Sequence, residues 1–426
     1  MKLRKNSVLV LSLCLLVTTS ILSQTRNNSP YSIYGIGIVN DYSNPISFGM
    51  GGVGIAFQDQ ASLNPLNPAS FGSLQEKSFI FDAGLVMNSS KLTSANLSEK
   101  ASYATLNHLL FGFQLGKYWK TSFGLIPFSD VGYGINLYEE RADLGKEINY
   151  IYKGSGGVSK AYITNAFNIN KKLSVGVEMG IFYGKIERSY LQLLTDATYY
   201  FYTKESEIYD YKDFYWRLGI QYNTTFHENI KVTFGAIFSA NTEVKTNLLM
   251  LTQLVQKPIA GYTDVIEDVK SLSVAGQTVI PGVFGIGMMI KNKENFKIGF
   301  DFEKQFWSKH KAFGEDGGMK NSTRIAIGAE FIPDRNSLFS YYKRIKYRAG
   351  LRYEKTPIYA NGNQLNEIGI SFGMGLPLRR TFSTINIGME IGQLGKTSNN
   401  LIKDTFVKFK LGVSMHQRWF EQRKYN

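Results

Sequence analysis

The stretch FKIGFDFE, residues 296–303, decides the fold class because it alternates strictly between apolar and polar side chains. Its even positions carry Phe or Ile, and its odd positions carry Lys, Gly, Asp and Glu. Side chains of a β-strand point alternately to opposite faces, so this stretch predicts a strand between an apolar and a polar environment. The same pattern recurs in INIGMEI, residues 385–391, and in VKFKLGVS, residues 407–414.

Segments of this kind follow one another from residue 77 onward. We count fourteen, centred near residues 83, 109, 127, 158, 179, 218, 236, 281, 300, 327, 349, 371, 388 and 410. Tight polar turns such as GKYWK, residues 116–120, alternate with longer connections, which is the asymmetry of outer-membrane barrels. We therefore predict an all-β protein, a transmembrane antiparallel β-barrel of about 14 strands. A soluble β-sandwich or β-rich repeat protein is the alternative, because its strands also have two unlike faces.

The N-terminus predicts export. Lys2, Arg4 and Lys5 precede an apolar run over residues 8–22, which is shorter than the roughly 20 residues of a membrane-spanning helix. We interpret residues 1–24 as a signal peptide and expect the mature protein in the outer membrane of a Gram-negative cell. The alternative is an N-terminal membrane anchor.

Residues 25–76 form a second unit ahead of the barrel, which spans residues 77–426. This segment is rich in glycine, as in GMGGVGIAF at residues 49–57, yet it carries enough apolar side chains to pack. We predict that it is an N-terminal plug in the barrel lumen; a disordered tail is the alternative. Gly49, Gly51 and Gly54 match a dinucleotide-binding spacing, but no βαβ unit surrounds them, so close backbone packing is the simpler interpretation.

Composition argues against most catalytic chemistry. The only cysteine, Cys14, lies in the signal segment, the four histidines are scattered, and no nucleophile motif such as G-x-S-x-G occurs. We expect no enzyme activity, no cofactor and no metal. The net charge of +14 indicates phosphates of membrane lipids or acidic periplasmic partners, not nucleic acid, because an exported chain does not meet nucleic acid. We expect a monomer.

The third predicted strand, FGLIPFSDVGYGINLY at residues 123–138, contains residues that a regular barrel strand avoids. Pro127 cannot donate a ladder hydrogen bond, and Gly132 and Gly134 follow shortly after Asp130. A harmless bulge is one interpretation. The other is a break in strand pairing that opens the wall sideways.

Two long connections, residues 189–209 and 247–267, are unusually apolar for loops that face water. Exposed apolar surface of this extent marks an interaction site, here a predicted ligand groove. Packing of the loops as a lid, or extension of the strands above the membrane, is the alternative. The groove residues are Leu193, Leu194, Tyr199, Tyr200, Phe201, Leu248, Leu249, Met250, Leu251 and Leu254.

The polar faces of the predicted strands carry charges of both signs. We expect salt bridges to hold the lumen together, which confines any ligand pocket to part of it. The inward charges we predict are Asp82, Glu178, Arg217, Asp301, Glu303, Glu330, Arg348, Arg352, Glu354, Glu367, Glu390, Lys408 and Lys410.

Asn67, Pro68 and Ala69 precede the first strand and resemble the N-P-A element in the plug of the FadL family of outer-membrane transporters for hydrophobic compounds. Together with the glycine-rich stretch upstream and fourteen strands behind it, the resemblance covers nearly the whole mature chain. The chain departs from that family at its end, where the last strand continues into Trp419, Phe420 and a basic tail.

The resemblance implies passive transport of a hydrophobic or amphipathic small molecule, such as a fatty acid or a hydrocarbon. Ligand would enter through the apolar groove, bind beside the plug and leave sideways through strand three into the membrane lipids. Some barrels similar to FadL, such as PorV, instead serve as partners or carriers in protein secretion, and this is the alternative function.

Overall fold

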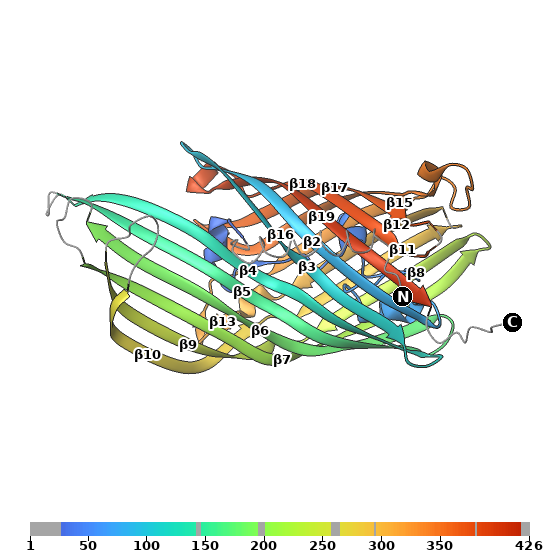
Figure 1. The fold of residues 1–426 in the computed structure, drawn as a ribbon, viewed down its shortest axis with the longest axis horizontal. Helices are drawn as coiled ribbons and strands as arrows, with labels where there is room; N and C mark the ends of the chain where they lie inside the picture. The colour runs from blue at the N-terminus through green and yellow to red at the C-terminus, as the bar shows by residue number, and fades with distance from the viewer. Residues whose placement is uncertain are drawn as a thin grey trace, which may run out of the picture.

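The computed structural model describes residues 27–141, 146–194, 201–256, 265–293, 295–379 and 381–418. Its antiparallel strands form one sheet that closes into a barrel (Figure 1). The sheet closes because β19 (Lys403–Arg418) pairs with β2 (Ser78–Thr93) along the whole length of both strands. The predicted closed antiparallel barrel is confirmed.

The wall contains the fourteen predicted strands, two of which are interrupted. β8 and β9 together form one wall strand with a break at Ala240 and Asn241, and β10 and β11 form the next, with a break at Pro281 and Gly282. The strand centre predicted near residue 281 therefore falls on a break, where Pro281 has no N–H to donate. Between β2 and β19 the wall contains β3 (Ser98–Gln114), β4 (Trp119–Arg141), β5 (Lys146–Asn168), β6 (Leu173–Leu194), β7 (Phe201–His227), β8 (Ile230–Ser239), β9 (Thr242–Gln256), β10 (Val265–Ile280), β11 (Val283–Asn292), β12 (Phe296–Gln305), β15 (Ser322–Phe331), β16 (Lys346–Ala360), β17 (Asn363–Pro377) and β18 (Thr384–Leu394).

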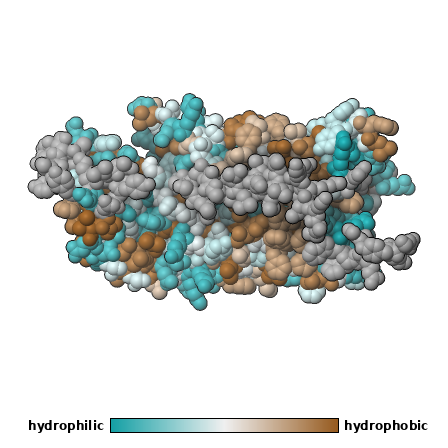
Figure 2. Space-filling model, viewed as in Figure 1, coloured by the Kyte–Doolittle hydropathy of each residue, from teal (hydrophilic) through white to brown (hydrophobic). Residues whose placement is uncertain are grey.

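The alternation of the sequence separates the two faces of the wall. On β12, Phe296 and Phe300 are each 40% exposed on the outside, whereas Asp301 is 1% exposed inside. Figure 2 shows hydrophobic side chains gathered over part of the outer surface, with more hydrophilic surface on either side. A wall that is apolar outside and polar inside is the arrangement of a transmembrane barrel.

The connections differ at the two ends of the barrel. At one end β16 and β17 are joined by Asn361 and Gly362 alone, both with positive φ, as a two-residue hairpin turn requires. At this same end β4 to β7, β9 and β10 extend well beyond the other strands (Figure 1). The connection between β12 and β15 contains η3 (Trp307–Lys309), β13 (Lys311–Ala312) and β14 (Glu315–Asp316), and β13 pairs with β10.

Residues 27–77, called the luminal segment below, lie inside the barrel. They contain η1 (Pro30–Ile33), β1 (Ile38–Val39), α2 (Pro45–Phe48) and η2 (Pro68–Ser73). No helix in the described residues is long and apolar enough to cross a membrane. The two remaining short helices, η4 (Tyr341–Arg344) and η5 (Ser398–Asn400), lie in connections between wall strands.

Glycines bring the luminal segment and the wall into backbone contact. A Cβ at Gly328 would lie 2.1 Å from the Met50 carbonyl oxygen, and one at Gly350 would lie 2.2 Å from the Gly51 nitrogen. Gly328 and Gly350 are direct cross-strand partners. The glycine-rich stretch therefore serves close packing, as its lack of a βαβ unit indicates, and not the binding of a nucleotide.

Candidate functional site

The barrel wall is split between β3 and β4. These strands pair over only six residues each, from Leu109 opposite Leu125 to Gln114 opposite Lys120. Beyond Leu125, β4 continues to Arg141 in register with β5, and β3 remains paired with β2. The pairing of β3 with β4 therefore ends partway along the wall. Beyond that point the edge of β4 that faces β3 is not paired with β3 and can make other contacts.

The split begins where the sequence predicts an irregular strand. Pro127 lies opposite Ser159 and Ser129 lies opposite Val158, so Phe128 is an extra, bulged residue. Pro127 cannot donate to a neighbouring strand, and a bulge bends the chain that carries it. Both effects turn β4 away from β3.

The luminal segment occupies the edge that β4 leaves open. Ile38 and Val39 of β1 pair with Asp130 and Ser129, and the Asn40 N–H donates to the Phe128 carbonyl over 2.9 Å. On the other side of the split, the Asn28 side chain donates to the Ser102 carbonyl of β3 over 3.0 Å. The segment therefore contacts both margins of the gap.

The other predicted residues of strand three have different surroundings. Asp130 is buried and accepts a 2.7 Å hydrogen bond from the Asn40 side chain. Gly132 exchanges hydrogen bonds with the Ser32 hydroxyl, and a Cβ at Gly132 would lie 1.7 Å from the Asn27 carbonyl oxygen. A Cβ at Gly134 would meet nothing within 4 Å. Gly132 is thus a contact point of the luminal segment, and Gly134 is not.

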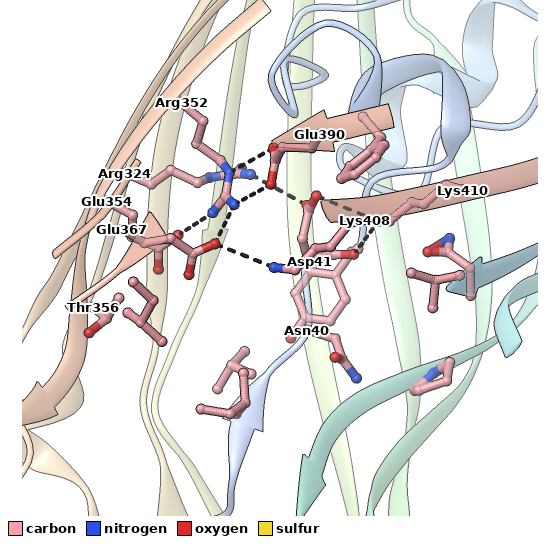
Figure 3. Close-up of a pocket in the computed structure, with 18 of the residues that line it drawn as sticks. Asn40, Asp41, Arg324, Arg352, Glu354, Thr356, Glu367, Glu390, Lys408 and Lys410 are labelled. Atoms are coloured by element: carbon pink, nitrogen blue, oxygen red, sulfur yellow. Dashed lines mark hydrogen bonds and ion pairs between the residues drawn. The ribbon is translucent and has the colours of Figure 1, made fainter. Parts of the chain in front are cut away.

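A cavity of about 130 Å³ lies beside the gap. Leu106 of β3 and Pro127 of β4 line it from the two margins, and Ile38 of β1 lies between them. The opposite side of the cavity carries charged groups from β15 to β19 (Figure 3). One end of the cavity is therefore apolar and the other is strongly polar.

Arg352 is the centre of the charged end. Its guanidinium pairs with Glu390 at 2.8 Å, Glu354 at 3.2 Å and Glu367 at 2.5 Å, and Lys408 reaches Glu367 at 3.4 Å (Figure 3). The Arg352 side chain is 5% exposed. Low local dielectric strengthens such pairs and makes loss of one partner expensive. The predicted luminal salt-bridge network is thereby confirmed on these strands.

Asp41 joins the luminal segment to this network. Its carboxylate lies 3.6 Å from Lys410 and 3.5 Å from Arg324, and it accepts the Ser43 hydroxyl. Burial opposes ionisation, but the positive charges of Lys410 and Arg324 outweigh it, so the pKa of the Asp41 carboxyl is held well below its usual range. Asp41 therefore anchors the segment as a carboxylate.

Lys160 of β5 forms a second feature that sequence reasoning missed. Its ammonium lies 4.6–5.1 Å from the ring centres of Tyr42, Phe128, Phe182 and Tyr215. These distances fit cation–π contact, and the four rings come from four different elements. A cavity of about 40 Å³ adjoins the group at the breaks in β8/β9 and β10/β11. In the sequence, the only signal of this cluster is the alternation of β5, which places Lys160 on the inward face.

Asn67, Pro68 and Ala69 lie at the start of η2, all buried. The Asn67 side chain accepts from the Ala69 N–H at 2.9 Å and donates to the Ile55 carbonyl at 2.7 Å. This is an N-cap that also ties two turns of the luminal segment together. Its visible role is to hold the shape of that segment.

Within the described residues the two apolar connections are not loops; they extend the wall strands, which is the alternative that the sequence left open. Residues 189–194 belong to β6, 201–209 to β7, 247–256 to β9 and 265–267 to β10, which together form the extension above the barrel. The sequence misleads because both faces of the extension are partly apolar.

Those predicted groove residues that the structure describes do not converge on one groove. Leu248 is buried and Leu193 packs against Leu191, Tyr202 and Val255, whereas Phe201 and Met250 are exposed. β9 also carries Leu249, Leu251 and Leu254. Tyr199, Tyr200 and the Leu194 side chain lie outside the described residues.

Metal ligands do not gather within the part of the chain that the structure describes, where no group of three or more His, Asp or Glu side chains is placed to hold an ion. The buried charged groups instead pair with one another, as around Arg352.

The family follows from the sequence as a whole. The family profile of BamG matches residues 4–426. The chain belongs to the BamG family. No curated protein matches it in sequence.

Solved structures show which barrels this BamG-family chain is similar to. The P. putida toluene transporter TodX has a TM-score of 0.59 and 15% identity, with 90% of this chain and 100% of TodX covered. The CymD monoaromatic hydrocarbon channel has a TM-score of 0.57, 15% identity and coverage of 90% and 100%. A *Pseudomonas aeruginosa* FadL homologue has a TM-score of 0.57, 11% identity and coverage of 91% and 100%. The expected resemblance to FadL-type barrels is confirmed at the level of the fold.

Proposed function

We propose that this protein carries a hydrophobic or amphipathic small molecule passively across the outer membrane of a Gram-negative cell and releases it sideways through the wall. The observation that carries this proposal is the gap between β3 and β4 with a cavity directly beside it. The similar barrels TodX, a toluene transporter, and CymD, a monoaromatic hydrocarbon channel, support the same class of ligand.

The cavity favours an amphipathic ligand. A polar head would meet Arg352 and its neighbours, while an apolar tail would lie along Leu106, Pro127 and Ile38 toward the gap. This route needs no catalysis and no cofactor, because the ligand moves from one environment to another without being chemically changed. Transfer of the tail from the cavity to the bilayer costs little free energy once the gap is open, because both surroundings are apolar.

In the closed state described above, the luminal segment stands in the way of this exit. We expect β1 to leave the edge of β4 when ligand passes, with the signal segment 1–24 already removed. The contacts to be broken are the two-residue pairing of β1, the hydrogen bonds around Gly132, those of Tyr31 with Ile402 and of Arg188 with the Gly35 carbonyl, and the packing of buried Tyr31 and Ile36. Two paired residues are far fewer than a wall strand has, so the segment can leave without opening the barrel.

A reversible disulfide tests the route. Val39 and Ser129 are direct cross-strand partners, and such Cα atoms lie about 4.5–5.5 Å apart, within the range a disulfide spans. In a Val39→Cys/Ser129→Cys variant we expect uptake of a fluorescent long-chain fatty acid and of toluene to fall to the background of cells lacking the protein. Reduction should restore uptake.

The matched control is Leu92→Cys/Glu99→Cys, which joins β2 and β3 at the far end of their hairpin. This disulfide should leave uptake unchanged in both redox states. Undiminished uptake by the oxidised Val39→Cys/Ser129→Cys variant, with the disulfide shown to be complete, would disprove the lateral exit.

A further inference from the structure

A second, much larger cavity opens at the end of the barrel opposite the long extension, away from the gap. It measures about 1040 Å³ and is called the vestibule below. Its floor is the luminal segment at residues 58–61, and its walls are the ends of β7, β8, β11, β12, β15 and β16. Outer-membrane barrels carry their longer connections on the outside, so this end faces the periplasm if the barrel carries out the proposed transport.

The vestibule is strongly basic. Eight lysine or arginine residues line it, against two acidic residues. Both acids already pair with lysines of the same lining: Asp59 with Lys346 at 3.4 Å, and Glu330 with Lys297 at 2.8 Å. The lining therefore keeps a large excess of positive charge. The basic residues are Lys171, Lys172, Lys231, Lys291, Lys297, Arg335, Arg344 and Lys346.

Three of these lysines stand in a row across adjacent strands. Lys231 of β8 is the direct partner of Lys291 of β11, which is in turn the direct partner of Lys297 of β12. Glu330 offsets the charge of Lys297 at 2.8 Å. Together with the other cations of the lining, the row gives this open cavity a surplus of positive charge, which points to an anionic ligand.

We propose that the vestibule binds an acidic, extended peptide segment of a periplasmic protein. The cations come from several strands and turns and are spread around the wall, which matches carboxylates spaced along a chain better than a single phosphate. Uncharged hydrogen-bonding groups lie among them, including Gln58, Asn223 and Thr233, and can bond a peptide backbone.

Two further observations favour a protein as the source of the charge. The barrel wall surrounds the vestibule, so headgroups of the surrounding bilayer do not reach it. On the connection between β15 and β16, which supplies Arg335 and Arg344 to the lining, Leu338 and Phe339 are 86% and 98% exposed. Apolar side chains beside a charged cavity are what a protein interface combines.

The test measures binding of fluorescein-labelled hexaglutamate to the purified full chain in neutral detergent by fluorescence anisotropy. We expect binding that weakens with added salt, and none for labelled hexaglutamine. The variant Lys171→Gln/Lys172→Gln/Lys231→Gln/Lys291→Gln should bind about tenfold more weakly, because several charge pairs are lost together.

The matched control is Lys91→Gln/Lys100→Gln. These two lysines are also direct cross-strand partners and are exposed, but they lie at the other end of the barrel. Binding should be unchanged in this variant. Equal affinity of the two variants for hexaglutamate would overturn the proposal.

Two more measurements keep the outcome decisive. The four-lysine variant should melt within a few degrees of the parent, so that weaker binding reports on the vestibule; a much lower melting temperature would mean that these lysines are structural and would overturn the proposal. If inorganic phosphate displaces hexaglutamate at equal total charge, the vestibule is a small-anion site and the peptide assignment is wrong. Fatty-acid uptake is measured separately, so failure here does not bear on the lateral exit.

Discussion

Gly132→Ala is the sharpest perturbation of the closed gap. The added Cβ would lie 1.7 Å from the Asn27 carbonyl oxygen, and Cβ contacts below 3.0 Å essentially do not occur, so the luminal segment must withdraw by at least about 1.3 Å. Three hydrogen bonds depend on this approach: two between Ser32 and Gly132, and one from the Asn27 side chain to the Asp130 carbonyl.

The expected loss of docking free energy follows from the number of hydrogen bonds that are broken. At about 1 kcal/mol for each net hydrogen bond, their loss costs about 3 kcal/mol, which raises the population of the undocked segment roughly a hundredfold. The barrel itself should keep its stability, because β4 stays paired with β5 on the opposite edge. The alanine is tolerated by the backbone, since Gly132 does not have a positive φ.

Hydrogen exchange is the assay. Amides of residues 28–40, and those on the edge of β4 that this segment covers, should exchange up to about a hundred times faster in Gly132→Ala, while those of β5 to β7 are unchanged. Gly134→Ala is the control on the same strand, because its Cβ would meet nothing within 4 Å. Identical exchange in the two variants, or faster exchange spread over the wall strands, would refute the reasoning.

Two further predictions concern the charges. Arg352→Met leaves three carboxylates without their common partner and should lower the free energy of unfolding by about 3–5 kcal/mol in urea titrations, whereas Lys355→Met, on the exposed face of the same strand, should change little. Burial opposes ionisation of Asp59, but Lys346 and Lys297 outweigh it and lower its pKa. Its contribution is therefore complete above its unfolded pKa of about 4 and is lost as the pH falls through the lower folded value. Asp59→Asn should be about 1 kcal/mol less stable at pH 7, and this difference should shrink as the pH falls; a difference independent of pH would contradict the assignment.

Alternation made the barrel predictable. Strands such as 296–303 separate apolar and polar residues so cleanly that their number, their faces and the burial of charges like Asp301 follow from the sequence. Pro127 likewise marks the irregular strand, because a missing N–H is a property of the residue itself.

Register and partner choice were not predictable, and the site depends on both. That β1 pairs with the free edge of β4 is a contact between residues about 90 positions apart, and no local pattern encodes it. The row of Lys231, Lys291 and Lys297 appears only once three strands are aligned. The sequence of the extension resembles loops because apolar residues occur on both of its faces, which hides the period of two that is typical of a strand.

The luminal segment is held in two different ways, and this decides which part of it can move. From Met50 to Ile55 its backbone lies against wall glycines and donates to Asp301 at 2.6 and 2.9 Å, contacts that leave no room for a shift. Before Asn40 it is held by a two-residue strand, by hydrogen bonds that include one from the Arg188 guanidinium to the Gly35 carbonyl, and by the packing of Tyr31 and Ile36. Asp41 lies at the boundary, tied to Lys410 and Arg324. We therefore expect any motion that opens the gap to be confined to the residues ahead of Asp41, while the rest of the segment stays in contact with the wall.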